Sequence, residues 1–488
     1  MDGPVITPPL TLAPGFDQCR KVQNRKEPAP SPKRAMVHTL GCRLNHAESG
    51  MLCDRLQAEG YRLVPFGEPA ELGIINTCTV TREADAKCRK AIRQFVKQNP
   101  TAFLAVIGCY SQTGFAEIAE IPGVDLIVGN QDKLSVLDHV ADRKQDHPVI
   151  LRERISPKDF SHAVIGELPF DQRANLKVQD GCDFFCSFCV IPRARGRARS
   201  REWNNTLEAA RSAARRGIRE LVLTGVNIGT YHSCGHSLVD LVDALDAIPG
   251  LLRVRISSIE PTTVDHGLLD RMADPGHKLL PYLHLPLQSG SDPVLRLMRR
   301  TYTTRAYRDF ARAAAQRVPQ LCLGTDIMVG FTGESEADFA ETCRFFEELP
   351  FAYTHVFPYS EREGTLSVRR QENVVPVPER QRRCAHLRRL SAAKRRAFMQ
   401  AHTGRTARVL LENPRDGGFP GYTENYIRVR IPDPGWDVRN QLVEVRLGRV
   451  RADWMEAACT RWNVAKPTGV MARPHTRLAQ TAALPVNG

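Results

Sequence analysis

Residues Gly181-Cys-Asp-Phe-Phe-Cys-Ser-Phe-Cys-Val190 place three cysteines, Cys182, Cys186 and Cys189, in one short segment with the spacing C-x3-C-x2-C. Three thiolates from one loop are typical ligands of an iron–sulfur cluster. A four-iron cluster held by three cysteines leaves one iron open, and that iron can bind and reduce a small molecule. The segment therefore predicts a redox enzyme. A zinc site that lacks one ligand is the alternative.

This segment follows a predicted strand at residues 174–178, the first of six strand-like runs in the middle of the chain. Helical stretches separate most of these runs, and such alternation is typical of a parallel sheet. Six units predict a central (β/α)6 partial barrel over residues 171–400, with its chemistry at the C-terminal ends of the strands. The other five runs are 220–223, 252–257, 282–285, 322–328 and 354–357.

A second trio, Cys42, Cys78 and Cys109, occurs nearer the N-terminus, and each of its members follows a predicted strand. Adjacent parallel strands lie about 4.8 Å apart, so the three thiols are expected in one small region, where they suit a second cluster. Buried structural cysteines are the alternative. The predicted strands are 35–40, 72–77, 103–107 and 125–128, and the predicted helices are 48–59 and 84–98; together they predict an α/β parallel-sheet domain over residues 35–145.

The remaining segments are predicted from composition and short patterns. A strongly basic helix is expected from 378 to about 400. The runs 407–411, 426–431 and 442–447 are typical of strands in a small antiparallel β-barrel, which is expected over residues 401–465. Residues 1–34 are expected to be a disordered extension, 146–170 a linker and 466–488 a flexible tail.

The 488-residue chain carries a formal net charge of +14 and has a pI of about 9.3. Such an excess of positive charge favours a polyanionic partner such as nucleic acid, or serves solubility alone. The chain has 14 cysteines and no apparent signal peptide, so we expect metal binding rather than disulfides, and a cytoplasmic location. No apolar run is long enough to cross a membrane.

Several ordered motifs give the chain a family resemblance. The cysteine loop resembles the signature of radical S-adenosylmethionine (SAM) enzymes. Further motifs are similar to those of the radical SAM methylthiotransferase family, with Thr332 in a place where that family more often has proline. These motifs are Gly41-Cys-Arg-Leu-Asn-His-Ala-Glu48, Asn76-Thr-Cys-Thr-Val-Thr81, Gly108-Cys-Tyr-Ser-Gln112, Thr224-Gly-Val-Asn-Ile-Gly229, Ser257-Ser-Ile-Glu-Pro261, Leu283-His-Leu-Pro-Leu-Gln-Ser-Gly-Ser291 and Thr325-Asp-Ile-Met-Val-Gly-Phe-Thr-Gly-Glu334.

The resemblance implies a fold, cofactors and site residues. It implies an RNA-binding TRAM domain at the C-terminal barrel, two [4Fe-4S] clusters on the two cysteine trios, and SAM as the source of a radical and of a methyl group. The second cluster would supply sulfur. The six trio cysteines are therefore the expected catalytic and metal-binding residues. The expected cofactor-binding residues are Phe188, Gly225, Asn227, Glu260, Gln288 and Ser289.

The resemblance also implies a substrate. Asn76–Thr81, Ile191-Pro-Arg-Ala-Arg-Gly196 and Gly421-Tyr-Thr-Glu-Asn-Tyr-Ile-Arg428 resemble the branch that acts on N6-threonylcarbamoyladenosine next to the tRNA anticodon. The expected partners are tRNA and an electron-donor protein, without a membrane or DNA. The alternatives are the same chemistry on isopentenyladenosine tRNA or on a ribosomal protein, and a non-catalytic, metal-bound RNA-binding protein.

Five arginines recur at alternate positions directly after the cysteine loop. Guanidinium groups bind phosphates and carboxylates through charge-assisted hydrogen bonds, so these side chains are predicted to contact tRNA phosphates or the carboxylate of the substrate. A solvated basic loop is the alternative. The arginines are Arg193, Arg195, Arg197, Arg199 and Arg201.

Overall fold

The first part of the chain is built around strands that are apolar along nearly their whole length, as expected for strands buried on both faces of a parallel sheet. The sheet order is β2-β1-β3-β4-β5-β6, and every neighbouring pair is parallel. The strands are β1 (Arg34–Thr39), β2 (Arg62–Leu63), β3 (Leu72–Thr77), β4 (Phe103–Gly108), β5 (Leu126–Val128) and β6 (Val149–Leu151).

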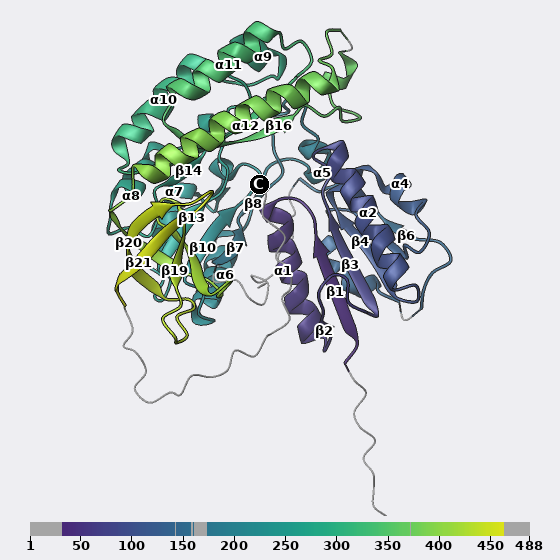
Figure 1. Ribbon diagram of the computed structural model, residues 1–488. Helices are drawn as coiled ribbons and strands as arrows, with labels where there is room; N and C mark the ends of the chain where they lie inside the picture. Colours follow the sequence, from purple (N-terminus) through teal and green to yellow (C-terminus); the bar gives the residue numbers. More distant parts are fainter. Residues whose placement is uncertain (1–31, 142, 158–159, 161–172, 371, 463–488) are drawn as a thin grey trace, which may run out of the picture. The chain divides into compact units, whose positions relative to one another are not determined.

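Two helices cover this sheet from opposite faces (Figure 1). Ile74 of β3 belongs to the apolar cluster that includes Leu52 and Leu56 of α1 (Arg43–Ala58). Its neighbour Ile75 belongs to the cluster that includes Phe95 of α2 (Arg82–Gln98). Successive side chains of a strand point to opposite faces, so the continuous apolar run serves both helices. The shorter helices α3 (Cys109–Thr113) and α4 (Phe115–Ala119) follow β4.

The computed structural model describes residues 32–141, 143–157, 160, 173–370 and 372–462, and residues from Lys33 onward belong to one compact unit. Most of the predicted extension (1–34) and all of the predicted tail (466–488) lie outside the described residues. Strand β6 corrects the predicted linker at 146–170, because Val149–Leu151 pairs with β5 and extends the sheet. No helix among the described residues is long and apolar enough to span a bilayer.

Six parallel strands form the central part of the chain and confirm the predicted (β/α)6 partial barrel. They fall into the orders β7-β10-β13 and β14-β15-β16, which are joined by isolated parallel bridges from Val254 to Leu279 and from Ser258 to His284. The strands are β7 (Arg173–Lys177), β10 (Glu220–Thr224), β13 (Arg253–Ile256), β14 (Tyr282–His284), β15 (Cys322–Val329) and β16 (Phe351–Pro358).

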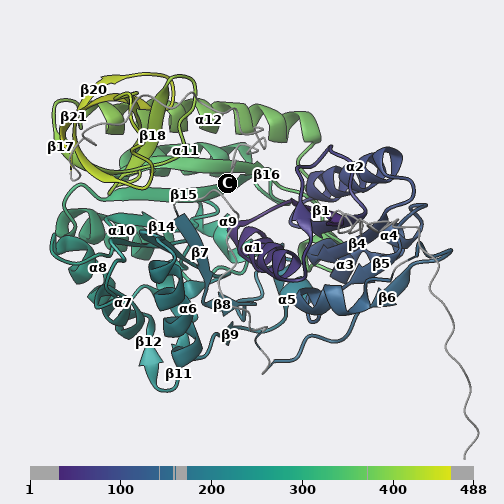
Figure 2. The same ribbon diagram turned by 90° about the horizontal axis from the view of Figure 1, so that it is seen from below.

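Helices surround these strands and enclose one large apolar core (Figure 2). Their termini carry ordinary capping groups: the Ser237 and Ser335 side chains form capping boxes with Asp240 and Asp338. The helices are α5 (Ile191–Arg195), α6 (Trp203–Arg215), α7 (Leu238–Asp246), α8 (His266–Ala273), α9 (Asp292–Leu297), α10 (Thr304–Arg317) and α11 (Glu336–Glu348), and the short strands are β8 (Gln179–Asp180), β9 (Arg199–Ser200), β11 (His232–Ser233) and β12 (His236–Ser237).

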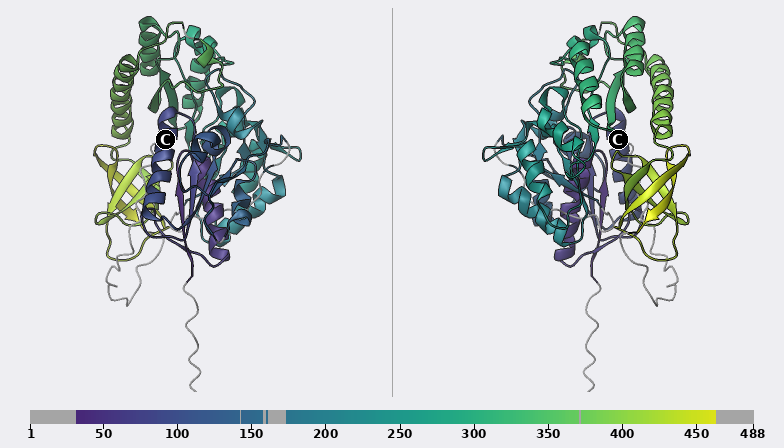
Figure 3. Two further views of the ribbon diagram at one scale, coloured as in Figure 1. Left: turned by 90° about the vertical axis from the view of Figure 1, so that its right-hand side faces the viewer. Right: turned by 90° about the vertical axis from the view of Figure 1, so that its left-hand side faces the viewer.

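The predicted basic helix is α12 (Val377–Gln400), which packs against β16 and leads into the C-terminal barrel (Figure 3). One face of it is structural. Arg380 is buried and pairs with Glu361, and Arg383 is buried and pairs with Glu334. The run of positive charge on this helix is therefore not a uniform solvated face.

The C-terminal barrel is closed, in the order β17-β18-β19-β21-β20. The small barrel that the sequence predicted is confirmed, and its strands pair antiparallel except for β19 and β21, which pair in parallel. The sequence pattern missed β18, whose glycines and proline resemble a turn, and β21. The strands are β17 (Thr406–Leu411), β18 (Gly418–Thr423), β19 (Arg428–Pro432), β20 (Leu442–Val450) and β21 (Met455–Arg461).

Candidate functional site

The Cys182–Cys189 loop begins directly after β8 and is pinned at a glycine. Gly181 has φ +72°, and a β-carbon there would lie 2.0 Å from the carbonyl oxygen of Arg197, so a side chain cannot be accommodated. The Cys182 amide donates to the Gly196 carbonyl over 3.1 Å, and the Cys189 amide donates to that of Cys186 over 3.0 Å. These bonds fold the segment back on itself and bring its three cysteines into one turn.

The second trio lies at one edge of the N-terminal sheet, as the sequence predicted. The neighbouring strands β1, β3 and β4 each lead to one of these cysteines. Cys78 and Cys109 directly follow β3 and β4, and Cys42 lies shortly after β1. A β-carbon on Gly41 would lie 2.8 Å from the Cys78 Sγ atom, so the glycine leaves room for that thiol. The sulfur of Cys88, on α2, contacts the Cys78 backbone amide and carbonyl at 3.4 Å.

A buried network of charges lies between the two trios. Glu48 of α1 accepts ion pairs from Lys133 at 2.5 Å, Lys177 at 2.8 Å and Arg195 at 3.0 Å. Asp180 pairs with Lys177 at 2.6 Å and with Arg195 at 3.0 Å. Burial alone would raise the pKa of Glu48, but Arg195, Lys133 and Lys177 hold it well below its usual value. Both carboxylates are thus ionised partners of buried cations.

The five arginines of the predicted RNA-contacting loop divide into two groups. Arg195 and Arg201 are each 1% exposed, and Arg199 is bonded to the Ser156 and Arg195 carbonyls. These three belong to the interior, so the structure corrects their predicted contact with phosphates. Arg193 donates to the Glu363 carbonyl, and Arg197 is 62% exposed beside Asp183. For these two the prediction stands untested.

The predicted cofactor-binding residues lie at strand ends and have internal roles as well. Gln179 Oε1 accepts from the Val226 and Asn227 amides, directly after Gly225. Asn227 Oδ1 accepts from the Glu260 amide over 3.2 Å, while its buried Nδ2 atom has no partner among the described residues. The structure therefore brings Gly225, Asn227 and Glu260 together at the ends of β10 and β13.

The other three predicted cofactor-binding residues lie around β14 and β15. Gln288 adopts φ +68°, and its amide donates to the Asp326 carbonyl over 2.8 Å. Ser289 is buried with its Oγ atom 3.3 Å from that of Thr342. Phe188 packs edge-on against Phe331 in a small apolar cluster, which favours a packing role for its ring.

Comparison with known proteins identifies the family. The family described as "Uncharacterized protein family UPF0004" matches residues 34–129, and the radical SAM superfamily matches residues 176–346. The chain is 36% identical over 424 residues to the threonylcarbamoyladenosine tRNA methylthiotransferase MtaB of Bacillus subtilis, which covers 84% of this chain and 92% of that protein. It is 37% identical over 409 residues to the enzyme of the same name from Aquifex aeolicus, covering 81% and 96%.

A relative with another substrate in its name is nearly as similar. The tRNA-2-methylthio-N(6)-dimethylallyladenosine synthase of Roseobacter denitrificans is 34% identical over 403 residues, covering 80% of this chain and 90% of that protein. The chain belongs to the radical SAM methylthiotransferase family. Like other members, this methylthiotransferase uses [4Fe-4S] clusters and SAM.

The two trios of the methylthiotransferase fit clusters better than single metal ions. Among the described residues, the only three His, Cys, Asp or Glu side chains whose ligand atoms all lie within 4.8 Å of one another are His284, Asp326 and His355. In each trio at least one pair of thiol sulfurs therefore lies more than 4.8 Å apart, which suits a cluster, in which each thiolate binds a different iron, better than one zinc ion. Burial raises the pKa of the Cys189 thiol to about 12, so a bound metal must displace its proton.

Sequence reasoning missed Arg300, which lies beside the first trio. Its Nη1 atom is 3.2 Å from Cys186 Sγ, and its Nη2 atom is 2.6 Å from both carboxylate oxygens of Glu260. Burial raises the pKa of Glu260, and Arg300 opposes that shift. Arg300 sits in a turn after α9 within an Arg-Arg pair, and nothing in this local pattern distinguishes it from a solvated residue.

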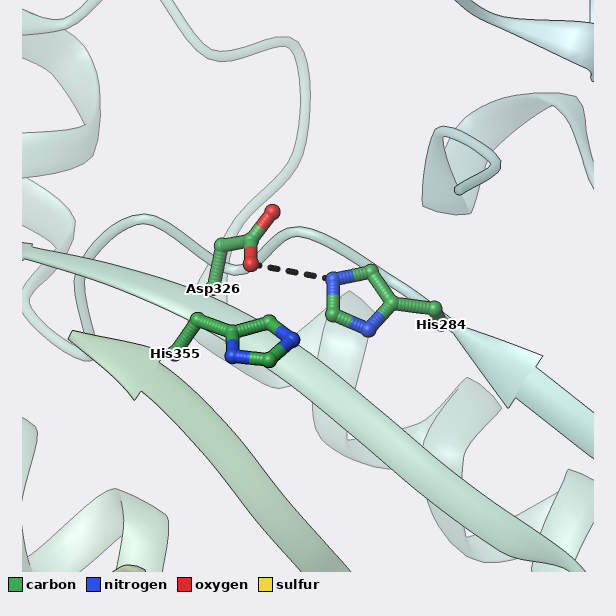
Figure 4. Close-up of side chains that lie close together, drawn as sticks. All are labelled: His284, Asp326 and His355. Atoms are coloured by element: carbon green, nitrogen blue, oxygen red, sulfur yellow. Dashed lines mark ion pairs between the residues drawn. The ribbon is translucent and has the colours of Figure 1, made fainter. Parts of the chain in front are cut away.

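Sequence reasoning also missed a polar group on the three neighbouring strands β14, β15 and β16 (Figure 4). His284 of β14 donates from Nε2 to an Asp326 carboxylate oxygen of β15 over 3.0 Å, and the ring of His355 of β16 lies beside this pair with its centroid 5.5 Å from that of His284. His284 Nδ1 is 3.1 Å from the Tyr353 hydroxyl. Each residue belongs to a strand that the sequence did predict, so polar side chains on otherwise apolar strands were the available signal.

Proposed function

We propose that this chain converts N6-threonylcarbamoyladenosine next to the tRNA anticodon to its 2-methylthio derivative. The observation that carries the proposal is the pairing of two cysteine trios on separate sheets, tied together by Glu48, Asp180 and Arg195. A chain that only generated a radical would need one trio. The threonylcarbamoyl substrate is the one in the names of the Bacillus subtilis and Aquifex aeolicus relatives.

In this proposal Cys182, Cys186 and Cys189 hold the cluster that binds SAM, and Cys42, Cys78 and Cys109 hold the auxiliary cluster. When bound, the clusters and SAM supply the radical, the sulfur and the methyl group. The chain supplies position: the network of buried charges fixes the supporting elements of both trios. Arg300 places a positive charge against Cys186. Gly225, Asn227, Glu260, Gln288 and Ser289 line the SAM site.

The proposal includes two partners. tRNA is the substrate, and Arg193 and Arg197 remain the residues after the cysteine loop that are proposed to contact it. An electron-donor protein is required because the radical cluster must be reduced by one electron for each cleavage of SAM. The competing substrate is isopentenyladenosine in tRNA, which the dimethylallyladenosine synthase of Roseobacter denitrificans represents.

Nucleoside mass spectrometry tests the proposal. The cells to use lack this chain and contain no second enzyme of the family. In them, 2-methylthio-N6-threonylcarbamoyladenosine should disappear from tRNA while its unmethylthiolated precursor accumulates. Purified enzyme with SAM and a reductant should restore the product on isolated tRNA. Loss of the isopentenyl product instead would assign the competing substrate.

A further inference from the structure

Arg43 stands out because it is half-buried without an acidic partner. It follows Cys42 directly, at the start of α1. Within the described residues it forms no ion pair, and its hydrogen bond goes from Nη2 to the Tyr426 hydroxyl over 3.0 Å. The other inward-facing arginines near the site, Arg195 and Arg300, each contact a carboxylate at 3.0 Å or less. A partly buried guanidinium without an acidic partner in the protein is suited to bind an anion from outside.

Aromatic hydroxyls surround this guanidinium rather than carboxylates. The Tyr426 ring lies 4.7 Å from that of Tyr282, and the Tyr282 hydroxyl is 2.7 Å from that of Tyr353. Burial would raise the pKa of Tyr426, yet Arg43, together with Arg173 and Arg255, holds it below its usual value. The local potential is therefore positive, although the groups that line this place are mostly neutral.

His284, Asp326 and His355 (Figure 4) lie in the same region of positive electrostatic potential. Burial lowers the pKa of His355 to about 4, and His284, Arg43 and Arg395 contribute to that shift. Arg395 of α12 lies 5.9 Å from the centroid of the Tyr353 ring and, like Arg43, forms no ion pair among the described residues. His355 is thus neutral at physiological pH, and the two guanidinium groups near it have no carboxylate partner among the described residues.

The donor types of His284, Asp326 and His355 would suit a divalent cation. The positive electrostatic potential argues against a cation, because two guanidinium groups lie near a site with a single carboxylate. That carboxylate already binds His284. The same potential favours an anion, which Arg43 and Arg395 can bind and which the neutral imidazole of His355 does not repel.

We propose that Arg43, assisted by Arg395, binds the carboxylate of the acidic substituent on the substrate adenosine, and that Tyr426 holds the Arg43 guanidinium in position. This inference rests on the proposed function, since the threonylcarbamoyl group ends in a carboxylate and the isopentenyl group is uncharged. It makes Arg43 a residue that selects acidic over neutral substrates, directly beside a cysteine of the second trio.

The test measures binding to the holoenzyme by fluorescence anisotropy with SAM omitted. Two anticodon stem-loop RNAs of one sequence are compared, one bearing threonylcarbamoyladenosine and one its neutral threoninamide analogue. Wild type should bind the acid form about tenfold or more tightly than the amide form. Arg43→Gln should abolish that ratio by weakening the acid form alone. Arg43→Lys, which keeps the charge, should retain part of it, and Tyr426→Phe should reduce it.

Arg62→Gln is the matched control, because Arg62 is an exposed arginine on β2 of the N-terminal sheet, and it should leave the ratio unchanged. An unchanged ratio in Arg43→Gln, or no discrimination by wild type, overturns the inference. If wild type nevertheless methylthiolates the acid RNA when SAM and reductant are added, the proposed function survives that failure. Tighter RNA binding with added Mn²⁺ that Asp326→Asn removes would overturn the anion site in favour of a cation site.

Discussion

Arg195 and Glu48 form a buried ion pair with Nη1 3.0 Å from Oε1, although 147 residues separate them in sequence. Arg195 is the last residue of α5, the helix that follows the loop of the first trio. Glu48 lies on α1, the helix that begins directly after Cys42. The pair therefore ties together the elements that carry the two cysteine trios. In the proposed function both trios act on one substrate base, and this bond would help to hold them in place relative to each other.

Removal of the Glu48 charge should destabilise the protein strongly. Glu48→Gln leaves Lys133, Lys177 and Arg195 buried with Asp180 as their only carboxylate partner in the network, and breaking a buried ion pair costs about 3–5 kcal/mol. The guanidinium midpoint of unfolding measures the loss. Glu59→Gln, at the exposed end of the same helix, should shift it little. Equal midpoints for the two variants would contradict the structural role of the network.

The fold was predictable because its strands are apolar runs that end in recognisable residues. Both trios could be located from sequence for the same reason, since Cys78 and Cys109 follow strands that only a parallel sheet would align. The charge network could not be predicted. Lys177 and Glu48 lie 129 residues apart, and the pairing of buried charges depends on tertiary contacts. Arg195 was misinterpreted because alternate arginines resemble a solvated segment, whereas α5 turns this one inward.

Loss of one cysteine from the second trio should remove one cluster and spare the other. Two four-iron clusters give about eight irons per chain, so Cys78→Ala should reduce the iron content to about four. It should still cleave SAM to 5′-deoxyadenosine, yet form no methylthio product. Iron analysis and chromatography of both products measure this. Cys53→Ala, a buried cysteine of α1, should keep about eight irons. Retention of eight irons in Cys78→Ala would remove Cys78 from the cluster.

Arg197 should contribute to RNA binding through charge alone. Arg197→Gln should weaken binding to every RNA sequence similarly and reduce the slope of log K against log salt by about 1. A salt series of anisotropy titrations measures the slope. Arg215→Gln is a matched control, because Arg215 is equally exposed and also pairs with one carboxylate, but lies at the end of α6 away from the cysteine loop. Identical slopes for the two variants would exclude a phosphate contact by Arg197.

Acid should destabilise the fold partly through His38. Burial, with a smaller effect of His46, lowers the pKa of His38 to about 4, and its ring stacks on Phe66 at 4.1 Å. Because the unfolded chain binds this proton near pH 6.5, stability is fully present above that pH and is lost as pH falls toward 4. Thermal midpoints between pH 7 and 5 should fall less steeply in His38→Phe than in wild type. Replacement of the exposed His147 by Gln should leave the slope unchanged.

Arg300 should raise the reduction potential of the first cluster. A cation 3.2 Å from Cys186 Sγ stabilises the reduced, more negative state of a cluster on that sulfur. Arg300→Gln should therefore lower the potential by an amount on the order of tens of millivolts, since a tenfold change in a one-electron equilibrium corresponds to ~59 mV. A redox titration followed by electron paramagnetic resonance measures it. The exposed neighbour Arg299 provides the control, and Arg299→Gln should keep the wild-type potential. A potential that Arg300→Gln leaves unchanged would show that the guanidinium only holds Glu260.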